Sequence, residues 1–214
     1  VDDDLDIDIL LVSDMDDDIQ LLRNLGDGTF APVEEIELDA TPAALAVADI
    51  NGDGFTDILV TLDLPEGAGV GILFGSASGH GPLAVYPGLH SGTASRTLRV
   101  GDVDLSGGLD LILNMANDSL VVARNVLGDA STWQTEPLNI PEGPLGYIYH
   151  TPLLIDVDND GDLDLAEARG SAVHWLRNKL DEGGALAFEE NVVAPWTTAG
   201  DGAFGKTACS TGAS

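Results

Sequence analysis

Short apolar runs separated by Gly, Asp and Asn recur along the whole chain. They are shorter than the roughly 10 residues expected of a helix, and turn-forming residues bound each of them. Runs of this length and spacing are typical of β-strands. The clearest examples are residues 43–48, 58–60, 111–113 and 152–155. The hydrophobic pattern therefore predicts many short strands.

One polar phrase of nine residues returns three times, each time just before an apolar run. Positions 1, 3, 5 and 9 carry an oxygen-bearing side chain, and position 6 is glycine. These copies, called the acidic loops below, span residues 49–57, 102–110 and 156–164. Residues 1–8 form a clipped fourth copy with Leu5 in place of glycine. Its position 1 would precede Val1, so we expect the chain to be a piece of a longer protein.

The loops recur at steps of about 49, 53 and 54 residues, a range that indicates propellers or arrays. A second phrase, a strand-like run that ends in Arg-Asn, keeps the same period at residues 18–24, 118–125 and 171–178. In the second copy, residues 70–79 fill this place, with Gly75 instead of Asn. One period thus predicts four short antiparallel strands, the content of one propeller blade.

The sequence predicts an all-β fold with about four visible four-stranded antiparallel blades of a β-propeller, as part of a larger ring. A single blade cannot bury both of its faces, so neighbouring blades must stack against it. We expect the blades at residues 1–40, 41–92, 93–145 and 146–195. Residues 196–214 are expected to form an incomplete blade or a tail.

Carboxylates on alternate residues of a tight turn can converge on one calcium ion, which takes six to eight oxygen ligands. Gly at position 6 allows the positive φ that such a turn requires. An EF-hand is the structural alternative, because Asp156 starts a full match with Glu167 at position 12. The other two loops place Val60 and Leu113 at position 12, which offer no oxygen. We therefore expect Glu167 on a strand surface.

The formal net charge of −29 is concentrated in the loops, which hold 16 of the 37 acidic residues, and four calcium ions would bring it to −21. The eight Lys and Arg residues do not cluster, so neither nucleic acid nor an anionic membrane is an expected partner. No run reaches the roughly 18 apolar residues of a membrane span. The four His residues are scattered, and Ala77 stands where a nucleophile elbow needs Ser. Lone Cys209 excludes a disulfide framework within this stretch.

The phrases resemble the FG-GAP repeat of integrin-α-like proteins, also called the VCBS-type repeat. The resemblance covers about residues 1–195 and rests on the acidic loops, on the string ending at Pro32 and on residues 73–79. It implies β-propeller blades, commonly seven per ring, with calcium between the first and second strands of a blade.

The resemblance further implies three full calcium sites and a partial fourth. The ligands at positions 1, 3, 5 and 9 would be Asp49, Asn51, Asp53 and Asp57; Asp102, Asp104, Ser106 and Asp110; Asp156, Asp158, Asp160 and Asp164; and, in the clipped loop, Asp2, Asp4 and Asp8. Ser106 replaces a carboxylate, so its site is expected to be weaker.

The resemblance and the lack of a catalytic constellation favour an extracellular module, secreted or on the cell surface, that binds a protein or glycan ligand in adhesion. Calcium would be structural, and no enzymatic activity is expected. The alternative is a non-catalytic domain of a larger secreted enzyme or surface assembly, with other assembly subunits as partners. Fold alone does not choose between them.

Overall fold

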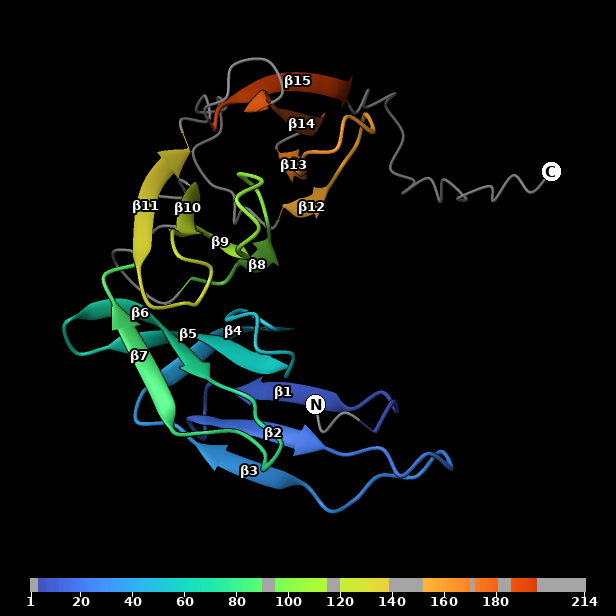
Figure 1. Cartoon of the computed structure of the whole chain (residues 1–214), viewed down its shortest axis with the longest axis vertical. Coiled ribbons are helices and arrows are strands. Elements are labelled where there is room, and N and C mark those ends of the chain that lie inside the picture. Colours follow the sequence, from blue (N-terminus) through green and yellow to red (C-terminus); the bar gives the residue numbers. More distant parts are fainter. Residues whose placement is uncertain are drawn as a thin grey trace, which may run out of the picture.

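The computed structural model describes residues 4–89, 95–114, 120–138, 152–169, 172–180 and 186–195. Within these ranges the chain forms four antiparallel sheets that follow one another in chain order (Figure 1). Sheet 1 contains β1 (Ile9–Ser13), β2 (Asp18–Leu22) and β3 (Glu34–Glu37). Sheet 2 contains β4 (Thr41–Ala48), β5 (Asp57–Leu64), β6 (Gly67–Leu73) and β7 (Leu83–Pro87).

The last two sheets repeat the four-strand pattern. Sheet 3 contains β8 (Leu98–Gly101), β9 (Asp110–Asn114), β10 (Leu120–Asn125) and β11 (Trp133–Leu138). Sheet 4 contains β12 (Leu153–Ile155), β13 (Asp164–Arg169), β14 (Ala172–Asn178) and β15 (Phe188–Pro195).

In each sheet, consecutive strands pair as a simple meander, so the predicted all-β fold is confirmed. Each acidic loop joins the first strand of its sheet to the second, as expected. The predicted blade boundaries stay a prediction. Residues 196–214, with Cys209, lie outside the described part of the chain.

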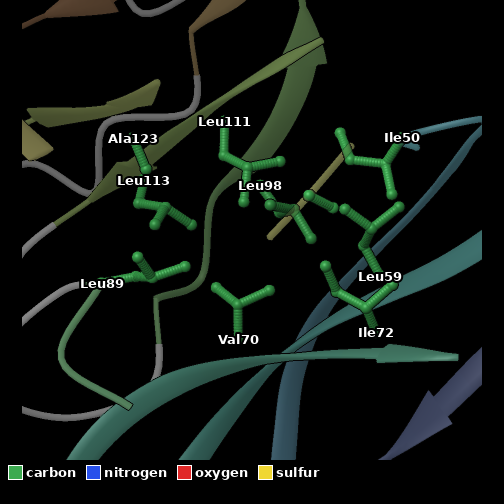
Figure 2. Close-up of a cluster of buried hydrophobic side chains, with 10 residues drawn as sticks. Ile50, Leu59, Val70, Ile72, Leu89, Leu98, Leu111, Leu113 and Ala123 are labelled. Carbon is green, nitrogen blue, oxygen red and sulfur yellow. The ribbon is translucent and has the colours of Figure 1, made fainter. Parts of the chain in front are cut away.

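The hydrophobic core lies between neighbouring sheets rather than within any one of them. Figure 2 shows the cluster between sheets 2 and 3, where Leu59, Val70 and Ile72 meet Leu111 and Leu113. A second cluster joins sheets 1 and 2, and a third joins sheets 3 and 4. The first strands of sheets 2, 3 and 4 contact one another in turn. Stacking thus buries faces that no single sheet could cover.

Strand β5 illustrates why this arrangement needs apolar residues on both faces of a strand. Ile58 and Val60 pack toward sheet 1, whereas Leu59 packs toward sheet 3. All three side chains are fully buried. A strand covered on both faces is expected to read as a continuous apolar run rather than an alternating one, and residues 58–60 do so.

The two end sheets expose apolar residues on the faces turned away from their neighbours. Leu10 and Val12 of β1 pack toward sheet 2, while Ile9 and Leu11 are exposed. In β12, Leu154 packs toward sheet 3 and its neighbours in the strand are exposed. The membership of these sheets in a larger ring stays a prediction.

Candidate metal centres

The acidic loops share one backbone conformation. At position 6, Gly54, Gly107 and Gly161 have φ of 89°, 89° and 99°. Leu5 takes the same place in the clipped loop with φ of 75°, so the loop keeps its shape although leucine disfavours this region. Position 4 also has positive φ, in Gly52, Leu105 and Asn159, which the sequence pattern did not reveal.

The side chains at positions 1 and 5 hold the turn by accepting backbone N–H groups. At position 1, one carboxylate oxygen of Asp49, Asp102 and Asp156 accepts the N–H of position 6, with N to O distances of 2.8, 2.9 and 3.2 Å. At position 5 the side-chain oxygen accepts the N–H of position 7, and the residues that do so are Asp4, Asp53, Ser106 and Asp160. These bonds orient the side chains before any ion binds.

The aspartate at position 9 has a structural role that spacing alone did not predict. Asp57, Asp110 and Asp164 are 0% exposed, and each opens the second strand of its sheet. In each, Oδ2 accepts the N–H of position 2 of the same loop, at 2.9, 3.1 and 3.0 Å. Oδ1 accepts an N–H from the last residue of the third strand, Asn125 and Asn178, or from Gly75, two residues beyond β6. This residue therefore ties the loop to its own sheet.

Two of the predicted ligand sets converge in space. Asp102, Asp104 and Asp110 each offer an oxygen atom within 4.8 Å of the others, and so do Asp156, Asp158 and Asp164. These are positions 1, 3 and 9 of the two loops. Oδ1 of Asp102 and of Asp156 is buried and accepts no hydrogen bond. An all-oxygen donor set with an unsatisfied oxygen fits a hard cation.

Asp160, at position 5 of loop 156–164, is not among the carboxylates that converge there. In loop 49–57, position 3 is Asn51, whose Nδ2 donates to Oδ2 of Asp53 at 3.0 Å. The charges of Asp53 and Asp49 act on Asp57, so the predicted ligands of this loop are also neighbours. In the clipped loop, Asp8 Oδ1 accepts the N–H of Asn24, at 2.8 Å.

The remaining predicted ligand of the clipped loop, Asp2, lies outside the described residues. Its partner position 5, Asp4, is described and accepts the N–H of Asp6 at 2.9 Å. The described residues of this loop thus repeat the local bonding of the full loops.

The carboxylates of these loops lie close together, so their negative charges repel one another and destabilise the charged form. Burial raises the pKa of Asp110 to about 6, and the charges of Asp104 and Asp102 add to the increase. Burial also raises the pKa of Asp57. A cation at the centre of the loop would remove the repulsion between like charges, so these shifts describe the loops without metal.

A buried asparagine joins each of two acidic loops to the next sheet. Asn125 Nδ2 of sheet 3 donates to the Ile50 carbonyl, at 3.0 Å, and Asn178 Nδ2 of sheet 4 donates to the Val103 carbonyl, at 2.9 Å. Ile50 and Val103 hold position 2 of the preceding loop, and their side chains lie in the cores between sheets. We call this contact the asparagine bridge. It couples the ligand loop to the packing of the neighbouring sheet.

The asparagines of the bridge are the last residues of the repeated Arg-Asn phrase. The sequence therefore shows these asparagines as a repeat, but it does not show that they bond to the neighbouring sheet. The arginine before each of them also approaches its loop: Arg124 Nη1 lies 3.5 Å from Asp104 Oδ2, and Arg177 pairs with Asp158 and Asp160. Trp175 Nε1 donates to Asp164 Oδ2 at 2.9 Å.

Glu167 corrects one sequence-based expectation. It was expected on a strand surface, but it is 5% exposed within β13. It lies three residues after position 9, as do Val60 and Leu113, which are fully buried. The alternation of side chains along a strand puts all three on equivalent faces. With strands on both sides of residues 156–164, the EF-hand alternative is wrong.

Residues 1–60 match the family model described as the FG-GAP-like repeat. The match covers sheet 1, β4 and the first residues of β5. Residues 1–60 are therefore an FG-GAP-like repeat, and the four successive antiparallel sheets of the chain have the arrangement of β-propeller blades. No curated protein matches the chain. Among the described residues, no helix is long and apolar enough to cross a membrane.

Proposed function

We propose that this chain is an extracellular β-propeller module that binds a protein or glycan ligand and depends on calcium for its stability. Calcium would occupy the three acidic loops and, in part, the clipped loop. In this role the ion is structural, because it neutralises carboxylates that otherwise repel one another within a packed fold.

The observation that carries the metal proposal is the convergence of positions 1, 3 and 9 in two loops, each with an unsatisfied buried oxygen. The donors are carboxylates, with no thiolate or imidazole among them, which favours a hard cation over zinc. Calcium accepts irregular sets of six to eight oxygens, whereas magnesium prefers a strict octahedron and keeps its waters. Calcium is therefore the ion that we propose.

The position of the loops supports a structural role for the ion. Position 2 of a loop lies between two proposed ligands, and in Ile50 and Val103 it also reaches the core and the asparagine bridge. An ion that fixes the loop would therefore also fix the contact between neighbouring sheets. Such a framework can present its connecting loops as a rigid binding surface.

The metal proposal is tested by thermal melting of the metal-free protein with and without calcium. At calcium tenfold above its dissociation constant, each site is expected to add about 1.4 kcal/mol of stability. An unchanged midpoint would contradict the proposal. Magnesium at the same concentration serves as the control and is expected to shift the midpoint less.

Ligand recognition is proposed from the class of protein and needs a separate experiment. Glycan-array binding and capture of extracellular proteins would be measured with calcium and with chelator. Calcium-dependent binding of one ligand class is the expected result. Absence of binding in both conditions would favour the alternative, a non-catalytic domain whose partners are other parts of an enzyme or surface assembly.

A further inference from the structure

The arginine of the Arg-Asn phrase places a positive charge at the acidic loop of sheet 4. Arg177 Nε lies 2.5 Å from Asp158 Oδ2, and its Nη2 lies 2.8 Å from Asp160 Oδ2. These carboxylates occupy positions 3 and 5. One guanidinium thus spans two of the four proposed calcium ligands of the loop.

The residue equivalent to Arg177 makes different contacts at the other two acidic loops. Arg124 of sheet 3 is shared between Asp104, at 3.5 Å, and Glu136, with which its Nη2 forms a short hydrogen bond. In sheet 2 the equivalent residue is Phe74, which packs on the core between sheets 2 and 3. The three loops therefore form a series: no equivalent arginine, one shared arginine, and one arginine that bridges two ligands.

The loop that Arg177 contacts also carries the most negative charge. Loop 156–164 has an aspartate at all four ligand positions and a fifth, Asp162, at position 7. Loops 49–57 and 102–110 have three aspartates each. By carboxylate count alone, loop 156–164 would bind calcium most tightly, because each added charge strengthens the attraction for a divalent cation. Arg177 opposes that attraction.

We propose that Arg177 is a built-in counter-ion that competes with calcium for Asp158 and Asp160. The inference rests on the proposed calcium site in loop 156–164. A carboxylate oxygen paired with a guanidinium must leave it, or share its charge, before it can ligate calcium. Without calcium the same pair reduces repulsion in the loop.

Two consequences follow for the chain. Loop 156–164 should hold calcium more weakly than its carboxylates suggest, and sheet 4 should tolerate loss of calcium better than sheet 2. Arg177 thus acts as an affinity-determining residue.

The test uses Arg177→Gln, which keeps a polar side chain without the charge. Terbium(III) serves as a luminescent replacement for calcium, excited through Trp175, whose indole hydrogen-bonds to Asp164 of the loop. Calcium is titrated against terbium, and isothermal titration calorimetry measures calcium binding directly. We expect Arg177→Gln to bind calcium about tenfold more tightly, a change equivalent to about 1.4 kcal/mol. The metal-free variant should also melt at a lower temperature than the wild type.

Two variants serve as matched controls. Arg23→Gln removes an arginine that pairs with Glu34 of the neighbouring strand, at 3.2 Å, and should leave the calcium affinity of loop 156–164 unchanged. Arg177→Lys keeps the positive charge but cannot present the planar fork that spans two carboxylates. Its calcium affinity is expected between those of the wild type and Arg177→Gln.

The outcomes separate this inference from the proposed function. Calcium binding by the wild type with equal or weaker binding by Arg177→Gln overturns the inference and leaves the calcium proposal standing. Absence of calcium binding in both proteins overturns both. If Arg177→Gln folds only with calcium, the lysine variant decides: calcium affinity at or below that of the wild type overturns the inference, and tighter binding supports it.

Discussion

The asparagine bridge predicts a large loss of stability when Asn125 is replaced by alanine. Its Nδ2 donates to the Ile50 carbonyl and its Oδ1 accepts the Ala130 N–H, both at 3.0 Å. Asn125 and both partner residues are at most 1% exposed. Asn125→Ala removes both side-chain bonds but keeps the backbone N–H that Asp110 accepts.

The expected magnitude follows from the two groups left without a partner. A buried donor or acceptor that loses its hydrogen bond costs about 1–3 kcal/mol. The free energy of unfolding should therefore fall by about 2–6 kcal/mol, a large part of the roughly 5–15 kcal/mol typical of a folded domain. Because Ile50 belongs to loop 49–57, calcium binding at that loop should weaken as well.

The assay is urea unfolding of the wild type and the variant, each metal-free and with calcium. The matched control is Asn24→Ala. Asn24 holds the equivalent place in sheet 1, but its side chain bonds to the Ile7 carbonyl and the Gly26 N–H in exposed surroundings. Water can replace those bonds, so a loss below about 1 kcal/mol is expected.

A second substitution isolates the contact between sheets. Asn125→Asp keeps an acceptor for the Ala130 N–H but turns a second acceptor toward the Ile50 carbonyl. It should also destabilise the protein, because a buried charge then faces a carbonyl oxygen. Stability of Asn125→Ala within 1 kcal/mol of the wild type, or equal to that of Asn24→Ala, would refute the reasoning.

Three further predictions concern the loops. Gly75→Ala should destabilise the protein by about 2–3 kcal/mol in urea unfolding, since the added Cβ would lie 2.3 Å from the Thr56 carbonyl oxygen; Gly81→Ala, whose nearest contact is 3.6 Å, should be nearly neutral. Leu5→Gly should raise stability by up to about 1 kcal/mol, because relief of the strained φ exceeds the added chain entropy; a lower melting temperature would contradict this. Burial raises the pKa of Asp110 from 3.8 to about 6 in the metal-free fold, so the folded state binds this proton more tightly than the unfolded state. The stability of the metal-free protein should therefore fall as pH rises from about 3.8 to about 6. Over the same range, the stability gained from calcium should grow. Melting of wild type and Asp110→Asn across this range checks it, since the variant should lose that part of the dependence.

Local spacing carried most of the fold prediction. Apolar runs and turn residues at a regular period predicted the sheets, because strand and turn preferences depend on near neighbours in the chain. The same locality predicted that positions 1, 3, 5 and 9 of a loop would converge, and Asp102, Asp104 and Asp110, at positions 1, 3 and 9, lie together. It also gave the glycine at position 6, since the conformation of a turn is set by a few residues.

Contacts between one repeat and the next could not be predicted from local spacing. Glu167 was expected on a surface because it is charged, but packing against the next sheet decides which face of a strand is buried. Positive φ at Leu105 has no local signal, because leucine does not favour it. The double role of position 9 appears only when the end of the third strand is brought beside the loop.

The sequence by itself determined the repeated unit: short strands, acidic loops between the first two of them, and the oxygen atoms available to a cation. Only the tertiary structure decided how those units depend on one another. Asn125 reaches Ile50, and Asn178 reaches Val103, across 75 residues each. Such bonds form because stacking of the sheets excludes water and leaves each buried donor and acceptor to find a partner in the neighbouring sheet.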